Sequence, residues 1–89
     1  MNHMIVNLKE AVAIAIDHLK STYDLPPSEK PRLEETMVDG KGHWLITLSF
    51  KQEGIFDERE YKTLEIDNKT KDVLAMRIRE PHFIDGGEI

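Results

Sequence analysis

Strict alternation of apolar and polar residues is the feature that most constrains the fold of this chain. In the segment WLITLSFK, which begins at Trp44, the residues Trp44, Ile46, Leu48 and Phe50 lie two positions apart. Because successive side chains of a β-strand point to opposite faces, this spacing predicts a central strand with one apolar face. The stretch YKTLEIDNKTKDVLAMRIRE repeats the alternation around a polar turn at Asp67–Asp72 and predicts a β-hairpin. The hairpin residues expected to face inward are Leu64, Ile66, Leu74, Met76 and Ile78.

A further strand is predicted just before Trp44. Arg32–Val38 is a modest strand pattern, and the segment Asp39-Gly40-Lys41-Gly42 that follows it contains residues that tolerate a positive φ. The apolar run resumes at Trp44, so this segment predicts a hairpin between the two strands.

One amphipathic helix is predicted near the amino end. Asn7 and Glu10 have the spacing of a capping box, in which the asparagine side chain accepts a hydrogen bond from the Glu10 amide. The helix is expected to end near Thr22–Asp24, because Pro26 and Pro27 lack the backbone N–H that would continue it. The apolar residues that share one face at helical spacing are Leu8, Ala11, Val12, Ala15, Ile16, Leu19 and Tyr23.

The order of these elements predicts an α+β fold. One N-terminal amphipathic helix is expected to pack on one face of a roughly four-stranded antiparallel meander sheet. A chain of 89 residues has apolar material for one core, so residues 1–89 are expected to form a single domain. Residues 1–6 and 81–89 are expected to be loose ends.

Charge and composition limit the classes of partner. The formal net charge of -5 repels a phosphate backbone, which argues against a nucleic-acid partner. The longest apolar run near the start, Ala11–Ile16, is too short to span a bilayer, so no membrane insertion is expected. The chain as written reads as cytoplasmic, and an exported protein is the alternative if a leader has been removed. Because there is no cysteine, neither disulfides nor thiolate metal sites are expected.

Three segments resemble the PepSY-type domain, a small module of peptidase propeptides and of short bacterial envelope proteins. They are the opening helix LKEAVAIAIDHL, the strand HWLITLSF and the closing hairpin YKTLEIDNKTKDVLAMRI. The resemblance covers roughly residues 7 to 80. It implies a non-catalytic module that regulates or inhibits a peptidase or another envelope protein, and it implies no catalytic residue.

The histidines have no spacing typical of a metal site. None of them forms a His-x-x-x-His or His-x-His pair, so no metal ligand, catalytic histidine or cofactor is predicted. The border of the apolar helix stripe and the hairpin mouth beside Trp44, where two of the histidines lie, are common places for ordinary interfacial histidines. The histidines of the chain are His3, His18, His43 and His82.

Paired carboxylates and serines give equally little support for an enzyme. Glu34 and Glu35 are adjacent in a predicted strand and should therefore point to opposite faces. The second acidic group is interleaved with Arg59, as a solvated surface would be, and no serine lies in a nucleophile-elbow context. That group comprises Asp57, Glu58 and Glu60, and the serines are Ser21, Ser28 and Ser49. We therefore expect a protein without catalytic activity.

Two surfaces are candidates for binding a protein partner. Ile55 and Phe56 lie in the loop after the central strand, where they either fold under the loop or protrude as a hydrophobic anchor. Leu45, Tyr61 and Val73 are expected on the sheet face away from the helix, which is either solvated or a docking or dimerisation face. The strand Arg32–Val38 is a further candidate for pairing with another chain if it is outermost.

These observations favour a non-catalytic protein-binding module with a protein partner, and a homodimer remains open. The alternative is a cytoplasmic immunity or antitoxin-like protein whose acidic surface masks a basic toxin. A small hydrolase is a third hypothesis, which would require a deep polar pocket with clustered carboxylates.

Overall fold

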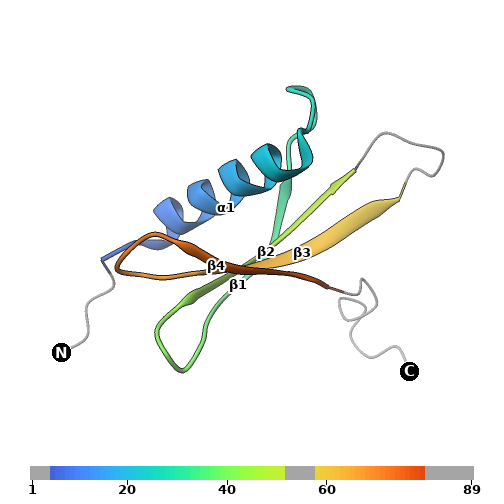
Figure 1. Cartoon of the computed structure of the whole chain (residues 1–89). Coiled ribbons are helices and arrows are strands. Elements are labelled where there is room, and N and C mark those ends of the chain that lie inside the picture. The colour runs from blue at the N-terminus through green and yellow to red at the C-terminus, as the bar shows by residue number, and fades with distance from the viewer. Residues whose placement is uncertain (1–4, 52–57, 80–89) are drawn as a thin grey trace, which may run out of the picture.

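One helix and four strands make up the protein (Figure 1). The structure is a computed structural model of the 89-residue chain and describes residues 5–51 and 58–79. The elements are α1 (Leu8–Tyr23), β1 (Arg32–Val38), β2 (Trp44–Lys51), β3 (Arg59–Ile66) and β4 (Val73–Ile78). The predicted α+β fold is confirmed, with the helix first and the strands following.

Local signals at both ends of α1 explain its bounds. At the start, the Asn7 side chain accepts a hydrogen bond of 2.8 Å from the amide of Glu10, as the capping spacing predicted. At the end, Asp24 takes a left-handed conformation with φ of 53°, and its N–H donates to the carbonyl of Lys20. The prolines at positions 26 and 27 follow this cap, so the helix ends where sequence predicted.

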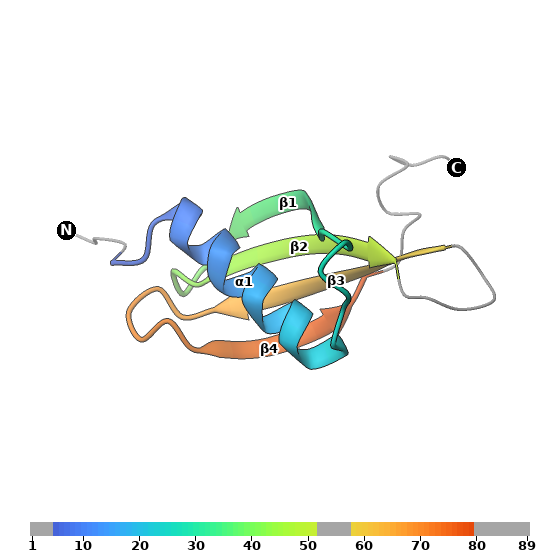
Figure 2. The same cartoon turned by 90° about the horizontal axis from the view of Figure 1, so that it is seen from above.

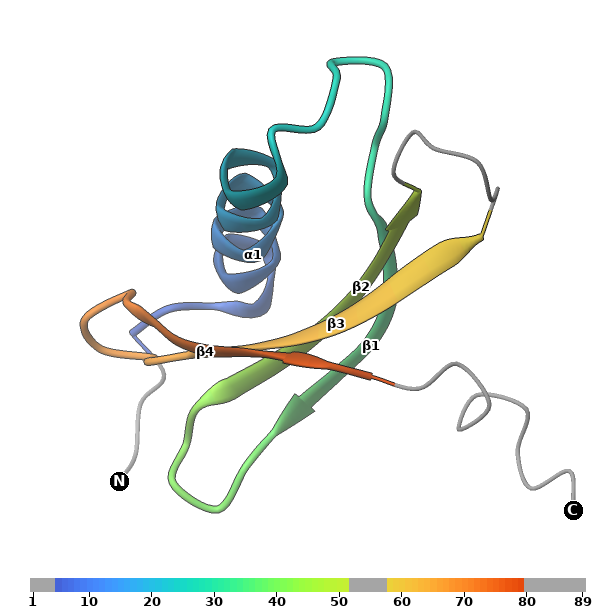
Figure 3. The same ribbon diagram turned by 45° about the vertical axis from the view of Figure 1, so that its right-hand side comes forward.

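The strands form one antiparallel sheet in the order β1-β2-β3-β4, so each strand lies beside its neighbour in sequence. The helix lies across one face of this sheet, as the view from above shows (Figure 2). It packs chiefly on β2 and also contacts β3 and β4. The opposite face carries no second layer from the described residues (Figure 3).

The core lies between α1 and the sheet. Ala11, Ala15 and Leu19 supply the helix side, where small residues let the backbone approach the strands. The sheet side consists of Ile46, Leu48, Phe50, Leu64 and Ile66, all fully buried. The ring of Tyr23 packs against that of Phe50, with centroids 5.0 Å apart, and closes the core at the end of the helix.

The segment before the helix is more ordered than the sequence predicted. Val6 is fully buried, its N–H donates to the carbonyl of Asn68, and its carbonyl accepts a hydrogen bond of 2.7 Å from Trp44 Nε1. The expectation that residues 1–6 are loose is therefore wrong for Val6. The sequence pattern did not reveal this contact, because it joins residues 38 positions apart. The expected loose end at 81–89 lies outside the described residues.

A β-bulge changes which residues of β4 face the helix. Ile66 pairs with Val73, whereas Glu65 pairs with Ala75, so Leu74 is an extra residue in β4. Val73 therefore packs on the core, and Leu74 is 48% exposed. The inward position expected for Leu74 and the outward position expected for Val73 are both wrong, because alternation fails where one strand gains a residue.

Candidate functional site

The sheet face away from α1, here called the outer face, carries no covering layer from the described residues (Figure 3). Its residues follow from the strand register, because partners in an antiparallel pair point to the same side. Four rows cross β2 and β3, namely Leu45 with Glu65, Thr47 with Thr63, Ser49 with Tyr61, and Lys51 with Arg59. Met37 and Glu35 on β1, and Ala75 and Arg77 on β4, extend the first two rows.

A hydroxyl pair occupies the middle of the outer face and is almost completely buried. The Oγ1 atoms of Thr47 and Thr63 lie 2.8 Å apart, and Arg79 Nη1 donates to both, at 3.1 and 3.0 Å. Arg79 Nη2 lies 3.0 Å from Glu35 Oε1, so the arginine joins β1, β2 and β3. The long side chain of Arg79 thus shields the two threonines without a second layer.

The next row, around Ser49, is built in the same way. Ser49 is fully buried, and its hydroxyl donates a hydrogen bond of 2.6 Å to Glu34 Oε2. Arg59 donates twice to this residue, from Nε to the hydroxyl and from Nη2 to the carbonyl, each at 3.0 Å. Ser49 has no histidine among these partners, so its hydroxyl serves to bind Glu34 and Arg59.

The two glutamates of β1 correct one sequence-based argument. Leu33 pairs with Leu48 and Glu35 with Thr47, so a bulge inserts Glu34 between them. Both carboxylates then contact groups of the outer face: Glu34 accepts a hydrogen bond from Ser49, and Glu35 forms an ion pair with Arg79. The expectation that adjacent strand residues point to opposite faces is wrong here, because the bulge interrupts the alternation.

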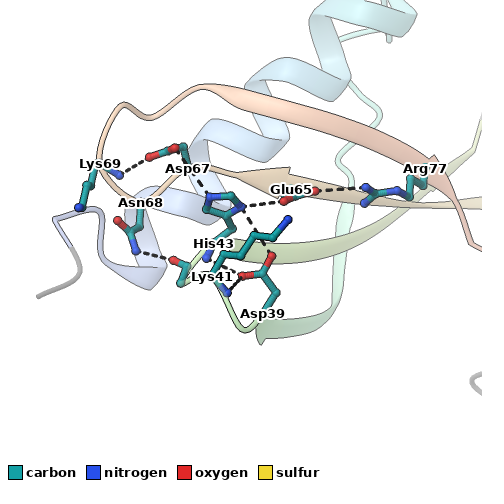
Figure 4. A network of polar contacts seen from close by, with 9 residues as sticks. Asp39, Lys41, His43, Glu65, Asp67, Asn68, Lys69 and Arg77 are labelled. Carbon is teal, nitrogen blue, oxygen red and sulfur yellow. Dashed lines mark hydrogen bonds and ion pairs between the residues drawn. The ribbon is translucent and has the colours of Figure 1, made fainter. Parts of the chain in front are cut away.

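A second polar group lies at one end of the outer face, where the two hairpin loops meet (Figure 4). Asp39 Oδ1 accepts hydrogen bonds from the amides of Lys41 and His43, at 2.8 and 2.9 Å, which folds the β1–β2 loop. Gly42 completes this loop with φ of 84°, a conformation that favours glycine. The Asn68 side chain donates to the Gly42 carbonyl and so joins this loop to the β3–β4 turn.

His43 lies at the centre of this group, which we call the His43 cluster: Asp39, His43, Glu65 and Asp67. Its Nδ1 is 2.7 Å from Glu65 Oε2 and 3.6 Å from Asp39 Oδ2, and its Nε2 is 3.8 Å from Asp67 Oδ2. Glu65 Oε1 also accepts a hydrogen bond of 3.2 Å from Arg77 Nη2. The imidazole is thus surrounded by three carboxylates from two hairpins.

Hydrogen bonds lower the pKa of each carboxyl in the His43 cluster. For Glu65, the side-chain bond from His43 is the main cause of the lowered pKa, and the Arg77 bond adds to it. The backbone amide of His43 is the main cause of the lowered pKa of Asp39. The amides of Thr70 and Lys69, which donate to Asp67 Oδ1, lower the pKa of Asp67. All three groups are therefore held in the charged form at neutral pH.

The structure separates the residues that were predicted to bind a partner. Leu45 and Tyr61 both lie on the outer face, but the hydroxyl pair lies in the row between them, and Val73 faces the helix. These three residues therefore form no common patch. Ile55 and Phe56 lie outside the described residues, so their binding role stays a prediction.

Sequence reasoning missed the His43 cluster. The expected pattern was two histidines close in sequence, whereas the cluster has one histidine, and its acidic residues lie up to 24 positions from it. The available signal was the strand register, because pairing Trp44 with Ile66 places His43 beside Glu65 and Asp67. His18 lies on α1 and is not part of the cluster, and His3 and His82 lie outside the described residues.

An open depression of about 320 Å³ lies near the far end of the outer face, away from the His43 cluster. Arg59 and Arg79 line it, and both already bind groups of the outer face. The remaining lining residues are Glu58, Glu60, Tyr61, Lys62 and Ile78. Of the second acidic group in the sequence, Glu58 and Glu60 lie here, and Asp57 is outside the described residues.

Three exposed apolar side chains lie on β1, one of the two edge strands of the sheet; the other edge strand, β4, exposes Leu74 and Ile78. Leu33, Met37 and Val38 are 46%, 50% and 45% exposed. The pairing register places Met37 on the outer face beside Leu45, and Leu33 and Val38 on the other face beside Leu48 and Trp44. We call these three side chains and the outward backbone of β1 the β1 edge.

No family model matches the chain, and no curated protein or solved structure shows significant similarity to it. Among the described residues, α1 is the single helix, and it is neither long nor apolar enough to cross a membrane.

Proposed function

We propose that this protein is a non-catalytic protein-binding module that binds an extended segment of another protein along the β1 edge. The observation that carries the proposal is the combination of an unpaired strand edge with three exposed apolar side chains. In the part of the chain that the structure describes, β2 is the only strand that pairs with β1. The unpaired N–H and C=O groups of an outermost strand are a template for a further strand.

The β1 bulge defines where such a segment would pair. Pairing is regular from Glu35 to Val38, whereas the extra residue Glu34 disturbs the part before it. Met37 and Val38 lie in the regular part and point to opposite sides of the sheet. A partner strand beside them would cover both apolar side chains and gain backbone hydrogen bonds.

The charge of the chain favours a different protein over a second copy. Two copies with a net charge of -5 repel each other, whereas a partner segment flanked by lysine or arginine is attracted. The partner that we propose is therefore an extended apolar segment with lysine or arginine residues on either side. The resemblance to PepSY-type domains adds a regulatory or inhibitory role towards a peptidase or another envelope protein.

The test places a photo-crosslinking residue at position 37 in cells of the native organism. Position 13, an exposed alanine of α1, is the matched control. We expect position 37 to crosslink a protein that position 13 does not, and mass spectrometry identifies the crosslinked segment. A synthetic peptide of that segment should then bind the purified protein in a fluorescence-anisotropy titration.

The substitutions Met37→Lys and Val38→Lys should each lower the affinity for this peptide at least about tenfold, because a charge replaces an apolar contact. Leu45→Lys on the outer face is not expected to change its affinity comparably. Equal binding by all variants, equal crosslinking from both positions, or a dimer by analytical ultracentrifugation that Met37→Lys dissociates would each overturn the proposal.

A further inference from the structure

The three carboxylates of the His43 cluster converge on one imidazole from separate parts of the chain. Asp39 and His43 come from the β1–β2 loop, Glu65 from β3, and Asp67 from the start of the β3–β4 turn. One potential ligand atom from each of Asp39, His43 and Glu65 lies within 4.8 Å of those of the other two. This is a mixed set of one nitrogen and two oxygen atoms, and not a group of acidic residues alone.

Each of the two nearest carboxylates is fixed through one oxygen and directs the other at His43. Asp39 Oδ1 is held by two backbone amides, and Glu65 Oε1 is held by Arg77 Nη2. The remaining oxygens, Asp39 Oδ2 and Glu65 Oε2, are the atoms that approach Nδ1. Groups that orient a carboxylate from behind in this way are typical of metal sites, where they fix the ligand geometry.

Asp67 lies on the other side of the imidazole ring. Its Oδ2 is 3.8 Å from Nε2, the nitrogen that does not face Asp39 and Glu65. A histidine that binds a metal through one nitrogen carries its proton on the other, and a carboxylate commonly accepts that proton. Asp67 lies on the Nε2 side of the ring and has to move closer to accept that proton, because 3.8 Å exceeds a hydrogen-bond distance.

We propose that the His43 cluster binds one divalent transition-metal ion of the zinc class through Asp39 Oδ2, His43 Nδ1 and Glu65 Oε2. Bonds of about 2.0–2.2 Å to a tetrahedral ion require ligand atoms about 3.3–3.6 Å apart. The present separations from Nδ1 are 2.7 Å to Glu65 and 3.6 Å to Asp39, and the ligand atoms of the three residues lie within 4.8 Å of one another, so the side chains must adjust by roughly 1 Å around the ion. With the metal bound, Nδ1 carries no proton and neutral His43 has its single proton on Nε2, towards Asp67; any proton that Nδ1 carried before is released to solvent.

The chemistry of the donor set selects the class of ion. Imidazole with carboxylates suits Zn²⁺ and its neighbours, whereas Mg²⁺ and Ca²⁺ prefer oxygen ligands throughout. Three carboxylates surround the site and Arg77 is paired with one of them, so the cluster attracts a cation. Three protein ligands leave the fourth tetrahedral position open to water or to a group of another molecule.

Metal binding would tie the β1–β2 loop to β3 and so stabilise the folded state over the unfolded one. This consequence does not depend on the β1 edge. Met37→Lys should keep full metal binding even if the proposed peptide binding fails.

The test titrates the purified full chain with ZnCl₂ in isothermal calorimetry and repeats the titration with MgCl₂. We expect saturable binding of one Zn²⁺ per chain, no comparable Mg²⁺ binding, and a higher melting temperature with Zn²⁺. His43→Gln and Glu65→Gln should each weaken Zn²⁺ binding at least about tenfold, and Asp67→Asn about tenfold through the orientation of the ring. His18→Gln, the matched control, should bind as the wild type does.

A measurement on the wild-type protein tests the proposal even if the variants fail to fold. Long-range ¹H–¹⁵N spectra of the imidazoles should show Zn²⁺ on Nδ1 of His43 and the proton on Nε2. The proposal is overturned by unchanged His43 signals at saturating Zn²⁺, by coordination through Nε2, or by folded His43→Gln protein that binds Zn²⁺ as tightly as wild type.

Discussion

The two faces of the sheet are made by alternate residues of the same strands, and both contain fully buried side chains. On the helix side, Ile46 and Phe50 are buried by α1, a separate layer of structure. On the outer face, Thr47 and Ser49 are buried to the same degree by Arg79, Arg59 and the two β1 glutamates. Burial on this sheet therefore does not require a second layer, because long charged side chains can cover short polar ones.

The two faces differ in what burial contributes to stability. Apolar burial is non-directional and gains about 25 cal/mol for each Å² removed from water. A buried hydroxyl contributes only when its hydrogen bonds are made, and it costs free energy when a partner is removed. The stability contributed by the helix side should thus depend on how much apolar side-chain volume is buried. The stability contributed by the outer face should depend on how many of its buried polar groups are hydrogen-bonded.

Phe50 and Ser49, neighbours in β2, give the largest expected contrast between the faces. Phe50→Ala removes the ring that packs on Tyr23 and should lower the free energy of unfolding by about 3–5 kcal/mol. Ser49→Ala removes hydrogen bonds to Glu34 and Arg59, and about 1–2 kcal/mol is expected. Urea unfolding followed by circular dichroism measures both, and equal losses would contradict the proposed difference between the faces.

Arg79 tests whether its charge or its bulk matters for the outer face. Arg79→Ala should cost about 1–3 kcal/mol, because it exposes Thr47 and Thr63 and leaves Glu35 without its cation. Arg79→Met keeps the apolar stem and removes the donors. If the hydrogen bonds of Arg79 matter more than its bulk, the melting temperature of Arg79→Met should be close to that of Arg79→Ala. A methionine variant as stable as wild type would show that shielding alone is sufficient.

The threonine pair gives a smaller and sharper test. Thr63→Val should lower stability by about 1 kcal/mol, because Thr47 loses its partner at 2.8 Å. The double variant Thr47→Val with Thr63→Val should cost less than the sum of the two single changes, because both polar groups are then gone. A double-mutant cycle from denaturant unfolding measures the coupling. Simple additivity would mean that the two hydroxyls act independently.

The smallest expected effect belongs to the helix side, at the ion pair that joins α1 to the β3–β4 turn. Glu10 Oε2 lies 3.0 Å from Lys71 Nζ, and the hydrogen bond and charge of Lys71 lower the pKa of Glu10. A lowered folded-state pKa adds stability above the unfolded value of 4.5, and this stability is lost as the pH falls through the folded-state pKa.

The Glu10→Gln variant should accordingly melt slightly below wild type at pH 7, and the difference should be smaller at pH 3. Scanning calorimetry at the two pH values makes the comparison, with Lys9→Gln as an exposed control in the same helical turn. A difference as large at pH 3 as at pH 7 would assign the effect to packing instead of charge.

Sequence patterns predicted the elements better than they predicted the faces. The helix bounds followed from Asn7 and the prolines, and the bounds of β1 were as expected, because caps and turns are local signals. The sheet faces predicted for Glu34 and Val73 were wrong because both residues lie at bulges. At a bulge, one extra residue in the strand changes the face to which the neighbouring side chains point. Whether a strand contains a bulge depends on its partner strand, which a single-strand pattern does not describe.

What the amino-acid sequence alone determined is the order and type of the elements and the apolar faces of the helix and of the central strand β2. This information is local, since helical and strand periodicity need only neighbouring residues. The tertiary structure alone decided which distant polar groups meet, such as His43 with Glu65 and Arg79 with Glu35. Such contacts depend on strand register and bulges, which are fixed only when the whole sheet pairs.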